Sequence, residues 1–289
     1  PATPSFYCYR CGIGGELSRF VQQIEGVDFA AAVQQLTDLA SSAPPGRRHP
    51  ATSSKRRSLD EAERTVLAAA VEVYHDELLA DPTALAYLHD RGLSLDTVQR
   101  YRLGYARGDD LLHHLRQHRL MLFAARRLGL LRGGREFLGG RIVIPESRDG
   151  QSIWLIGRAL HCASDAPKYL GLPGRKPLLG WDEARHEHEV YVVEGPFDWL
   201  TLRQWGLSAV ALLGTHAPPE ALRALARFER AYLVLDIDAA GRAATEKLLA
   251  ALGCRAVAVA LHDVKDVADW ARLPDGRARF LDMVAASGS

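Results

Sequence analysis

The clearest hydrophobic pattern lies in the C-terminal third of the sequence, where short apolar runs alternate with helix-like segments. These runs occupy residues 190–193, 209–213, 232–235 and 256–260. Strands that alternate with helices in this way predict an α/β domain built on an open sheet. Carboxylates follow two of the runs directly: Glu194 follows the first, and Asp236 and Asp238 follow the third. A helix over residues 277–285 is expected near the end of this domain.

The middle of the chain predicts helices and then a β-hairpin. Over residues 59–131, apolar side chains recur at the spacings found along one face of successive helices. Residues 137–145 and 152–160 have the apolar composition of strands, and Asp149-Gly150 between them is typical of a tight hairpin turn. A loop rich in Gly and Pro then leads to the α/β domain.

Four parts are therefore expected along the chain. Residues 1–40 contain a Cys-x-x-Cys and two amphipathic segments. Residues 41–58 are rich in Pro, Ser and basic residues, a composition typical of a linker. Residues 59–181 form the basic helical and hairpin part, and residues 182–289 form the α/β domain with its acids.

Length and composition are those of an ordinary globular protein. The 289 residues are 47% hydrophobic and 25% charged, and the length suggests about two domains. No apolar run approaches the ~20 residues that span a bilayer, and no secretory leader pattern opens the sequence. Four cysteines, two of them in the Cys-x-x-Cys, fit a reducing compartment better than a disulfide framework. We therefore expect a cytoplasmic protein with no membrane partner.

The net charge of +1 conceals an asymmetry along the chain. Residues 1–181 carry 24 basic and 19 acidic side chains, whereas residues 182–289 carry 12 and 16. A basic region that precedes an acidic one favours a polyanion as ligand, handled by a metal ion at the acids. An arginine-rich coding bias explains the basic excess equally well, so charge alone does not decide between the two.

The carboxylates at the strand ends are the candidate chemistry. In an open α/β sheet, the carboxyl ends of the strands form the crevice where ligands bind. Grouped carboxylates repel one another unless protons or a cation intervene, and oxygen ligands suit Mg²⁺ or Mn²⁺. If the third strand continues through Asp236 and Asp238, both side chains lie on one side of it. Asp198, one turn into the helix after Glu194, is expected to cap that helix or to lie behind the ligands.

Cys8 and Cys11 have the spacing of one half of a zinc site. A structural zinc site needs four ligands, and the next Cys or His in the sequence is His49. A thioredoxin-like redox motif is less well supported, because no βαβ pattern surrounds the pair. Cys162 and Cys254 are isolated and are expected to be inert.

The order of these motifs resembles that of the bacterial DnaG-type primases, whose catalytic domain has a TOPRIM fold. Residues 6–15 resemble the second half of that family's zinc-binding domain, and residues 87–93 and 103–105 resemble the helical entry to its RNA-polymerase domain. The basic elements that hold phosphates in the family resemble residues 140–145, 157–158 and 167–170. The TOPRIM signatures resemble residues 193–198, 213–215, 236–241 and 265–266. The resemblance covers almost the whole chain.

This resemblance implies a TOPRIM-type open sheet and the synthesis of short RNA primers on single-stranded DNA from ribonucleoside triphosphates. It implies that Glu194, Asp236 and Asp238 are catalytic and, with Asp266, bind two Mg²⁺ or Mn²⁺ ions. The implied nucleotide and template contacts are Arg141, Arg158, Lys168, Tyr169 and Lys265. The implied supporting residues behind the site are Asp198, Gly195, Gly214, Thr215 and Gly241. Zn²⁺ is implied at Cys8 and Cys11.

The sequence departs from the family's pattern in several places. The Cys and His that supply the family's first two zinc ligands are absent from it. Gly171 stands where the family has Asn, and Val267 stands where it has Pro. No segment after the TOPRIM region resembles the family's helicase-binding domain. The sequence is therefore expected to be a compact primase, a fragment, or a phage or plasmid relative whose contact with a replicative helicase lies elsewhere.

Two other functions stay open at this point. A TOPRIM nuclease shares Glu194 and the Asp-x-Asp pattern. A primase-like module without activity would bind single-stranded DNA only; the incomplete zinc half-site favours it and the intact acids oppose it. A topoisomerase needs a tyrosine nucleophile on a large separate domain, for which the sequence has no room. A haloacid-dehalogenase-type phosphatase carries its Asp-x-Asp after the first strand rather than the third.

Overall fold

Two compact units, Pro1–Lys55 and Arg56–Ser289, make up the chain. The computed structural model describes residues 5–7, 14–16, 18–19, 21–22, 27–34, 58–161, 167–261, 264 and 266–287. In the first unit, β1 (Ser5–Tyr7) pairs antiparallel with β2 (Gly14–Glu16), and residues 29–34 are helical. The predicted zinc half-site at Cys8 and Cys11 lies outside the described residues.

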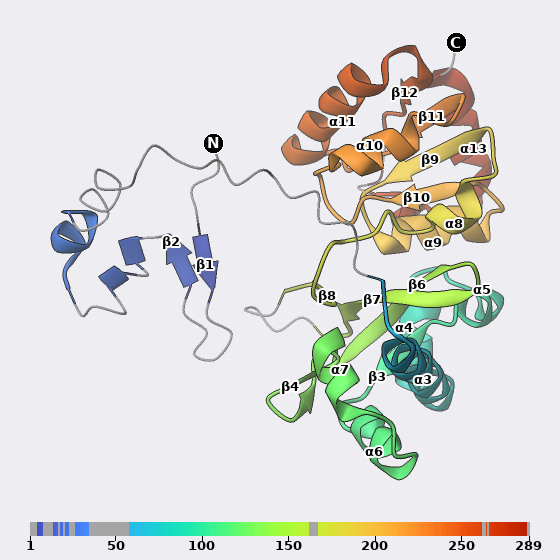
Figure 1. The fold of residues 1–289 in the computed structure, drawn as a ribbon. Helices are drawn as coiled ribbons and strands as arrows, with labels where there is room; N and C mark the ends of the chain where they lie inside the picture. The colour runs from blue at the N-terminus through green and yellow to red at the C-terminus, as the bar shows by residue number, and fades with distance from the viewer. Residues whose placement is uncertain are drawn as a thin grey trace. The chain divides into compact units, whose positions relative to one another are not determined.

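The second unit begins with a helical layer (Figure 1). Its helices are α3 (Glu61–Ala80), α4 (Pro82–Asp90), α5 (Leu95–Arg100), α6 (Asp110–Gln117) and α7 (Leu122–Leu128). Asp60 and Glu63 form a capping box at the start of α3, because each side chain accepts a hydrogen bond from the other's backbone N–H. Asp81 caps α4, and Ser94 caps α5. The region predicted as helical beyond residue 109 is divided after α6, where Arg119 has a left-handed backbone conformation (φ 53°).

An antiparallel sheet packs against these helices. Its strands, in spatial order, are β3 (Gly104–Ala106), β6 (Arg141–Arg148), β7 (Gln151–Ala159) and β8 (Tyr169–Gly171). A small hairpin of β4 (Leu131–Arg132) and β5 (Arg135–Glu136) precedes β6. The predicted turn between β6 and β7 is confirmed, since Asp149 and Gly150 both have positive φ (49° and 74°), as a hairpin turn of the primed type requires.

The C-terminal part of the second unit is an α/β layer structure (Figure 1). Four parallel strands lie in the order β10 (Ala209–Ala211), β9 (Glu189–Val193), β11 (Arg230–Leu233) and β12 (Ala256–Ala258). The accompanying helices are α8 (Trp181–Ala184), α9 (Pro196–Gln204), α10 (Pro219–Leu225), α11 (Ala239–Leu252), α12 (Val267–Trp270) and α13 (Gly276–Ser287), with a 3₁₀ turn η1 (Gly253–Arg255) after α11. The predicted α/β fold is confirmed. Within the described residues, no helix combines the length and the apolar character needed to cross a membrane.

The alternation of side chains along β9 explains how both faces of this sheet are covered. Val192 belongs to a buried cluster with Leu225 of α10 and Leu248 of α11. Val193, the next residue, belongs to a different cluster with Leu200 of α9 and Phe280 of α13. Successive side chains of a strand point to opposite faces, so each face of the sheet buries its own set of helices.

Strand order also determines where a ligand can bind. The chain leaves β9 for β10 on one side and then returns to β11 on the other side of β9. This reversal is a topological switch point, where the loops after neighbouring strands separate and leave a crevice. Glu194 follows β9 and Asp236 lies beyond the end of β11, so the predicted acids flank the switch point.

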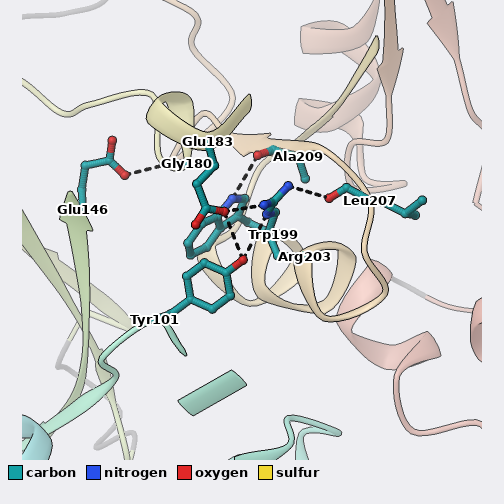
Figure 2. Close-up of polar contacts among 8 residues, drawn as sticks. All are labelled: Tyr101, Glu146, Gly180, Glu183, Trp199, Arg203, Leu207 and Ala209. Atoms are coloured by element: carbon teal, nitrogen blue, oxygen red, sulfur yellow. Dashed lines mark hydrogen bonds and ion pairs between the residues drawn. The ribbon is translucent and has the colours of Figure 1, made fainter. Parts of the chain in front are cut away.

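Polar contacts join the α/β part to the helices and hairpin before it (Figure 2). The Tyr101 hydroxyl, at the end of α5, accepts a hydrogen bond from Arg203 Nε (3.1 Å) and donates to Glu183 Oε2 (3.2 Å). Arg203 of α9 also forms an ion pair with Glu183 of α8. The buried Glu146 of β6 accepts a hydrogen bond from the Gly180 backbone N–H at 2.8 Å. The helical and hairpin part is therefore joined to the α/β part through α5 and β6.

Candidate active site

One cavity of about 310 Å³ lies between the antiparallel sheet and the carboxyl ends of the parallel strands. Its acidic lining consists of Glu194, Asp198, Asp236 and Asp266. Its basic lining consists of Arg91, Arg158, Lys168 and Lys176, and aromatic rings are supplied by Tyr169 and Phe197. The cavity thus brings together acids and bases that the sequence places far apart.

Glu194 is half-buried at the end of β9, where its position is fixed by the strand. Its Oε1 atom accepts a hydrogen bond from the Asp236 backbone N–H at 3.3 Å. Burial, together with the nearby negative charge of Asp236, raises the pKa of the Glu194 carboxyl to about 7. In the absence of a cation, this group therefore exchanges its proton near neutral pH.

Asp236 and Asp238 are not related by strand alternation. The prediction that both side chains lie on one side depended on a strand continuing through them, but β11 ends at Leu233. Asp238 is instead the N-cap of α11, and its Oδ1 accepts a hydrogen bond from the Gly241 N–H at 2.8 Å. Asp236 lines the cavity, whereas Asp238 is exposed beside it.

Gly241 allows α11 to begin directly against the acids. A Cβ at this position would clash with the Asp236 carbonyl oxygen and would lie 2.8 Å from Glu194 Oε1. Any larger residue would therefore displace the backbone or the carboxylate. The first turn of α11 also directs backbone N–H groups and the positive end of the helix dipole toward this region.

Asp198 lies within α9 rather than at its cap, since Gly195 is the N-cap of that helix. The alternative prediction, that Asp198 caps the helix, is therefore wrong. Its buried Oδ1 accepts a hydrogen bond from the Ala268 N–H at 2.9 Å, at the start of α12. Burial and the neighbouring charge of Asp266 raise the pKa of the Asp198 carboxyl. Asp266 caps α12, and its Oδ1 accepts from the Asp269 N–H at 3.0 Å.

The carboxylates form a donor set that suits a divalent cation. Four of them line one cavity, and their mutual repulsion contributes to the raised pKa values of Glu194 and Asp198. A bound Mg²⁺ or Mn²⁺ would relieve that repulsion with the oxygen ligands that these ions prefer. In the part of the chain that the structure describes, however, no group of three or more His, Cys, Asp or Glu side chains is arranged closely enough to hold a metal ion.

Arg158 holds the opposite wall together. Its side chain is only 6% exposed, and it donates from Nε to the Tyr87 hydroxyl (2.5 Å) and from Nη1 to the Tyr169 hydroxyl (2.6 Å). The guanidinium also lies 4.5 Å from the centroid of the Phe197 ring. Arg158 therefore links α4, β8 and α9 at the edge of the cavity.

Arg141 is also 6% exposed, and it does not line the cavity. Its Nη1 donates to the carbonyl oxygens of Pro167 (2.9 Å) and Lys168 (3.3 Å), which positions the segment before β8. Lys168 itself is exposed and lines the cavity. Gly214 lines it as well, Thr215 faces a neighbouring cleft, and Lys265 lies outside the described residues.

Two basic lining residues were not predicted as site residues from the sequence. Lys176 lines the cavity, and its Nζ donates to the Leu213 carbonyl oxygen at 3.0 Å. The basic pair Arg175-Lys176 in the Gly/Pro loop was the available signal. Arg91 follows α4 and lies over the Tyr87 ring, 5.5 Å from its centroid. It belongs to the segment 87–93 that resembles the family's helical entry, but that resemblance did not assign it to the cavity.

Three family descriptions match successive parts of the chain. Residues 1–46 match the CHC2 zinc finger, residues 73–176 match the N-terminal domain of the DNA primase catalytic core, and residues 191–273 match a Toprim-like family. The second range contains the antiparallel sheet, and the third contains all of the parallel sheet except the first two residues of β9.

Individual proteins and solved structures are also similar to most of this chain. The DNA primase of Pseudomonas putida is 34% identical over 274 residues, which cover 86% of this chain and 41% of that protein. The chain thus spans about two fifths of that relative's length. The crystal structure of a DNA primase domain from Pseudomonas aeruginosa is 31% identical, covers 78% of each chain and has a TM-score of 0.68. A DnaG primase catalytic domain bound to single-stranded DNA is 25% identical, also covers 78% of each chain and has a TM-score of 0.66. The chain belongs to the DnaG-type primase family.

Proposed function

We propose that this chain synthesises short RNA primers on single-stranded DNA by transferring nucleotides to the 3′-hydroxyl of a growing strand. The observation that carries the proposal is that Glu194, Asp236 and Asp266 line the same cavity as Lys168 and Lys176. Such a cavity can bind a cation and a polyphosphate at the same time. We assign ribonucleoside triphosphates and a DNA template as the substrates. The DNA primase relatives and the DnaG domain bound to single-stranded DNA support this assignment.

The carboxylates are proposed to hold the divalent ions. Glu194 and Asp236 supply ligands from the cavity, and Asp238 and Asp266 complete the set from the first turns of α11 and α12. Two ions bound there would lower the pKa of the attacking hydroxyl and stabilise the leaving pyrophosphate. Glu194 must give up its proton to act as a ligand, which its pKa of about 7 permits at neutral pH.

The basic wall is proposed to orient the nucleotide and the template. Lys168 and Lys176 present ammonium groups to the phosphates. Arg158 keeps Tyr169 and Phe197 in place, so these rings form a stiff boundary to the cavity. Arg141 acts on the same wall by holding the carbonyl groups before Lys168. Lys265 is proposed as a further phosphate contact.

Further partners follow from the family. We propose that Cys8 and Cys11 are zinc ligands, in agreement with the CHC2 zinc finger match over residues 1–46. We also propose that a replicative helicase supplies the single-stranded template, and that the chain acts in the cytoplasm.

The proposal is tested by the double variant Asp236→Asn with Asp238→Asn. Primer synthesis on a single-stranded template with Mg²⁺ or Mn²⁺ should fall at least about a thousandfold, since the ion contributes several kcal/mol to the transition state. Asp275→Asn, an exposed acid of the same part of the unit, should leave synthesis unchanged. Metal-dependent synthesis that persists in the double variant would contradict the proposal. Metal-dependent cleavage of labelled DNA without synthesis by the unmodified chain would show a nuclease instead.

A further inference from the structure

A second and larger cavity, of about 850 Å³, lies beyond the loop that follows β10. We call it the basic cleft. Its basic lining consists of Arg148, Arg175, Lys176, His216, Arg223 and Arg227. Its apolar lining includes Trp181 of α8, Leu212 of the loop and Ala221 of α10. The volume is within the range of ~300–1,000 Å³ that is typical of small-molecule sites.

The charges of the basic cleft are mostly uncompensated. Glu220 is the one acid among its lining residues, and it forms an ion pair with Arg175. Within the described residues, Arg223 and Arg227 are exposed and have no ion pair, and Arg148 Nε is buried without a hydrogen-bond partner. Guanidinium groups that converge on one hollow without acidic partners favour an anion with several oxygens, such as a phosphate.

An aromatic ring gives the basic cleft a second type of contact. Trp181 is half-buried, lines the cleft and is held edge-on by Phe228, with 5.8 Å between the ring centroids. The Arg227 guanidinium lies 5.8 Å from the Trp181 ring centroid. A planar ring beside an arginine is the usual combination for a nucleobase stacked next to its phosphate. A flexible acidic peptide would use the charges but not the ring.

The basic cleft adjoins the active-site cavity. Lys176, Leu213 and Gly214 line both of them. Leu213 has a left-handed backbone conformation (φ 61°), which is unfavourable for leucine and for most other residues except glycine. Lys176 Nζ donates to the carbonyl oxygen of this same residue at 3.0 Å. Such strain is typical of backbone at functional sites, and here it forms the boundary between the two cavities.

We propose that the basic cleft is a second nucleotide-binding site, which takes the phosphate and the base of a nucleotide next to the reaction site. Arg148, Arg223 and Arg227 bind the phosphate oxygens, and Trp181 stacks on the base. The nucleotide can be a free one or a unit of a strand whose end lies at the acids, because the chemistry of recognition is the same in both cases.

Binding without metal separates this site from the carboxylates. A fluorescent GTP derivative should bind the full chain in EDTA, where the acids repel a polyphosphate. The charge-reversed variant Arg223→Glu with Arg227→Glu should weaken this binding at least about tenfold. The control Arg64→Glu with Arg100→Glu reverses two exposed arginines on α3 and α5 and should leave the affinity unchanged. Circular dichroism confirms that both variants fold.

Competitors and a ring variant test the two halves of the ligand. Inorganic tripolyphosphate should displace the probe. Trp181→Ala should weaken binding of the probe but not binding of tripolyphosphate. Trp181→Phe should retain most of the affinity for the probe. Displacement by a short single-stranded oligonucleotide at lower concentration than by GTP assigns the site to a strand, and the opposite order assigns it to a free nucleotide.

Three results would overturn the proposal. The first is the absence of metal-independent binding by the unmodified chain. The second is an equal loss of affinity in the control variant. The third is displacement by poly-glutamate as effective as that by tripolyphosphate. Because the readout is binding without metal, failure here leaves the proposed primer synthesis intact, and failure of synthesis leaves this site intact.

Discussion

The acidic wall and the basic wall of the active-site cavity differ in what holds their charged groups. Glu194 and Asp236 project from strand ends and meet other acids, so they make the fold less stable unless a cation is bound. Arg158 lines the basic wall, and Arg141 holds the backbone before Lys168 on that wall. Both arginines are buried and hydrogen-bonded, so they contribute to the fold itself. The two walls therefore separate function from stability: substitution of Glu194 or Asp236 should lower activity, and substitution of Arg158 or Arg141 should lower stability.

The largest expected effect comes from the acidic wall. Glu194→Gln should lower primer synthesis by about a thousandfold or more, because one charge that attracts the ions is lost. Its melting temperature without metal should not fall, since a neutral side chain relieves the repulsion by Asp236. Glu189→Gln changes an exposed acid at the other end of β9 and should alter neither property. A Glu194→Gln variant that loses stability would mean that the acid has a structural role.

The basic wall should respond in the opposite way. Arg158→Ala leaves the Tyr87 and Tyr169 hydroxyls without their donor, so the free energy of unfolding should fall by about 2 kcal/mol. Urea unfolding measures this loss. Arg91→Ala removes an arginine from the same cavity that only contacts a ring, and should cost less than ~0.5 kcal/mol. Unchanged stability with lost template affinity would make Arg158 a direct ligand contact instead.

Gly241 affects both stability and activity, because it lies in the first turn of α11 and close to Glu194 and Asp236. Alanine is favoured over glycine in a helix by about 1 kcal/mol, so Gly241→Ala would stabilise α11 if space allowed. The contacts with Glu194 and Asp236 predict the reverse: a lower melting temperature and a roughly tenfold loss of synthesis through displacement of the acids. Ala243→Ser, on the exposed face of α11, is the matched control. A more stable and fully active Gly241→Ala variant would refute the close approach.

The smallest expected effect is a pH dependence of metal stabilisation. The pKa of Glu194 is about 7 in the fold and 4.5 ordinarily, so its neutral form is favoured. Its contribution to stability without metal is complete below pH 4.5 and is lost as the pH rises through 7. Mg²⁺ binds the ionised form, so the Mg²⁺-induced rise in melting temperature should be larger at pH 8 than at pH 6. A difference of about 3 °C is expected, or ~1 kcal/mol, since the half-exposed carboxyl is partly screened by solvent. In the Glu194→Gln variant, the difference in Mg²⁺ stabilisation between pH 8 and pH 6 should be smaller.

Much of the α/β part was predictable because its signals are local. Apolar runs followed by Glu194 or Asp236 place acids at strand ends, and the alternation of strands and helices brings these ends to one edge. The turn at Asp149-Gly150 was predictable for a similar reason, since few dipeptides accept positive φ at both positions.

Tertiary contacts decided the rest. Sequence spacing does not reveal that β11 ends at Leu233 and leaves Asp238 as a helix cap. Nor does it reveal whether an arginine such as Arg158 faces a ligand or two tyrosine hydroxyls from distant elements. The role of Lys176 at the boundary of two cavities depends on the left-handed turn at Leu213, and leucine gives no sequence signal for that conformation.

The central claim, that the acidic wall binds divalent ions, is tested most directly by titration with Mn²⁺ followed by electron paramagnetic resonance. At pH 8, where Glu194 is ionised, the unmodified chain should bind Mn²⁺, and the Glu194→Gln variant should bind it at least about tenfold more weakly. The Glu189→Gln variant should match the unmodified chain. Equal Mn²⁺ affinity in the unmodified chain and in Glu194→Gln would contradict the account.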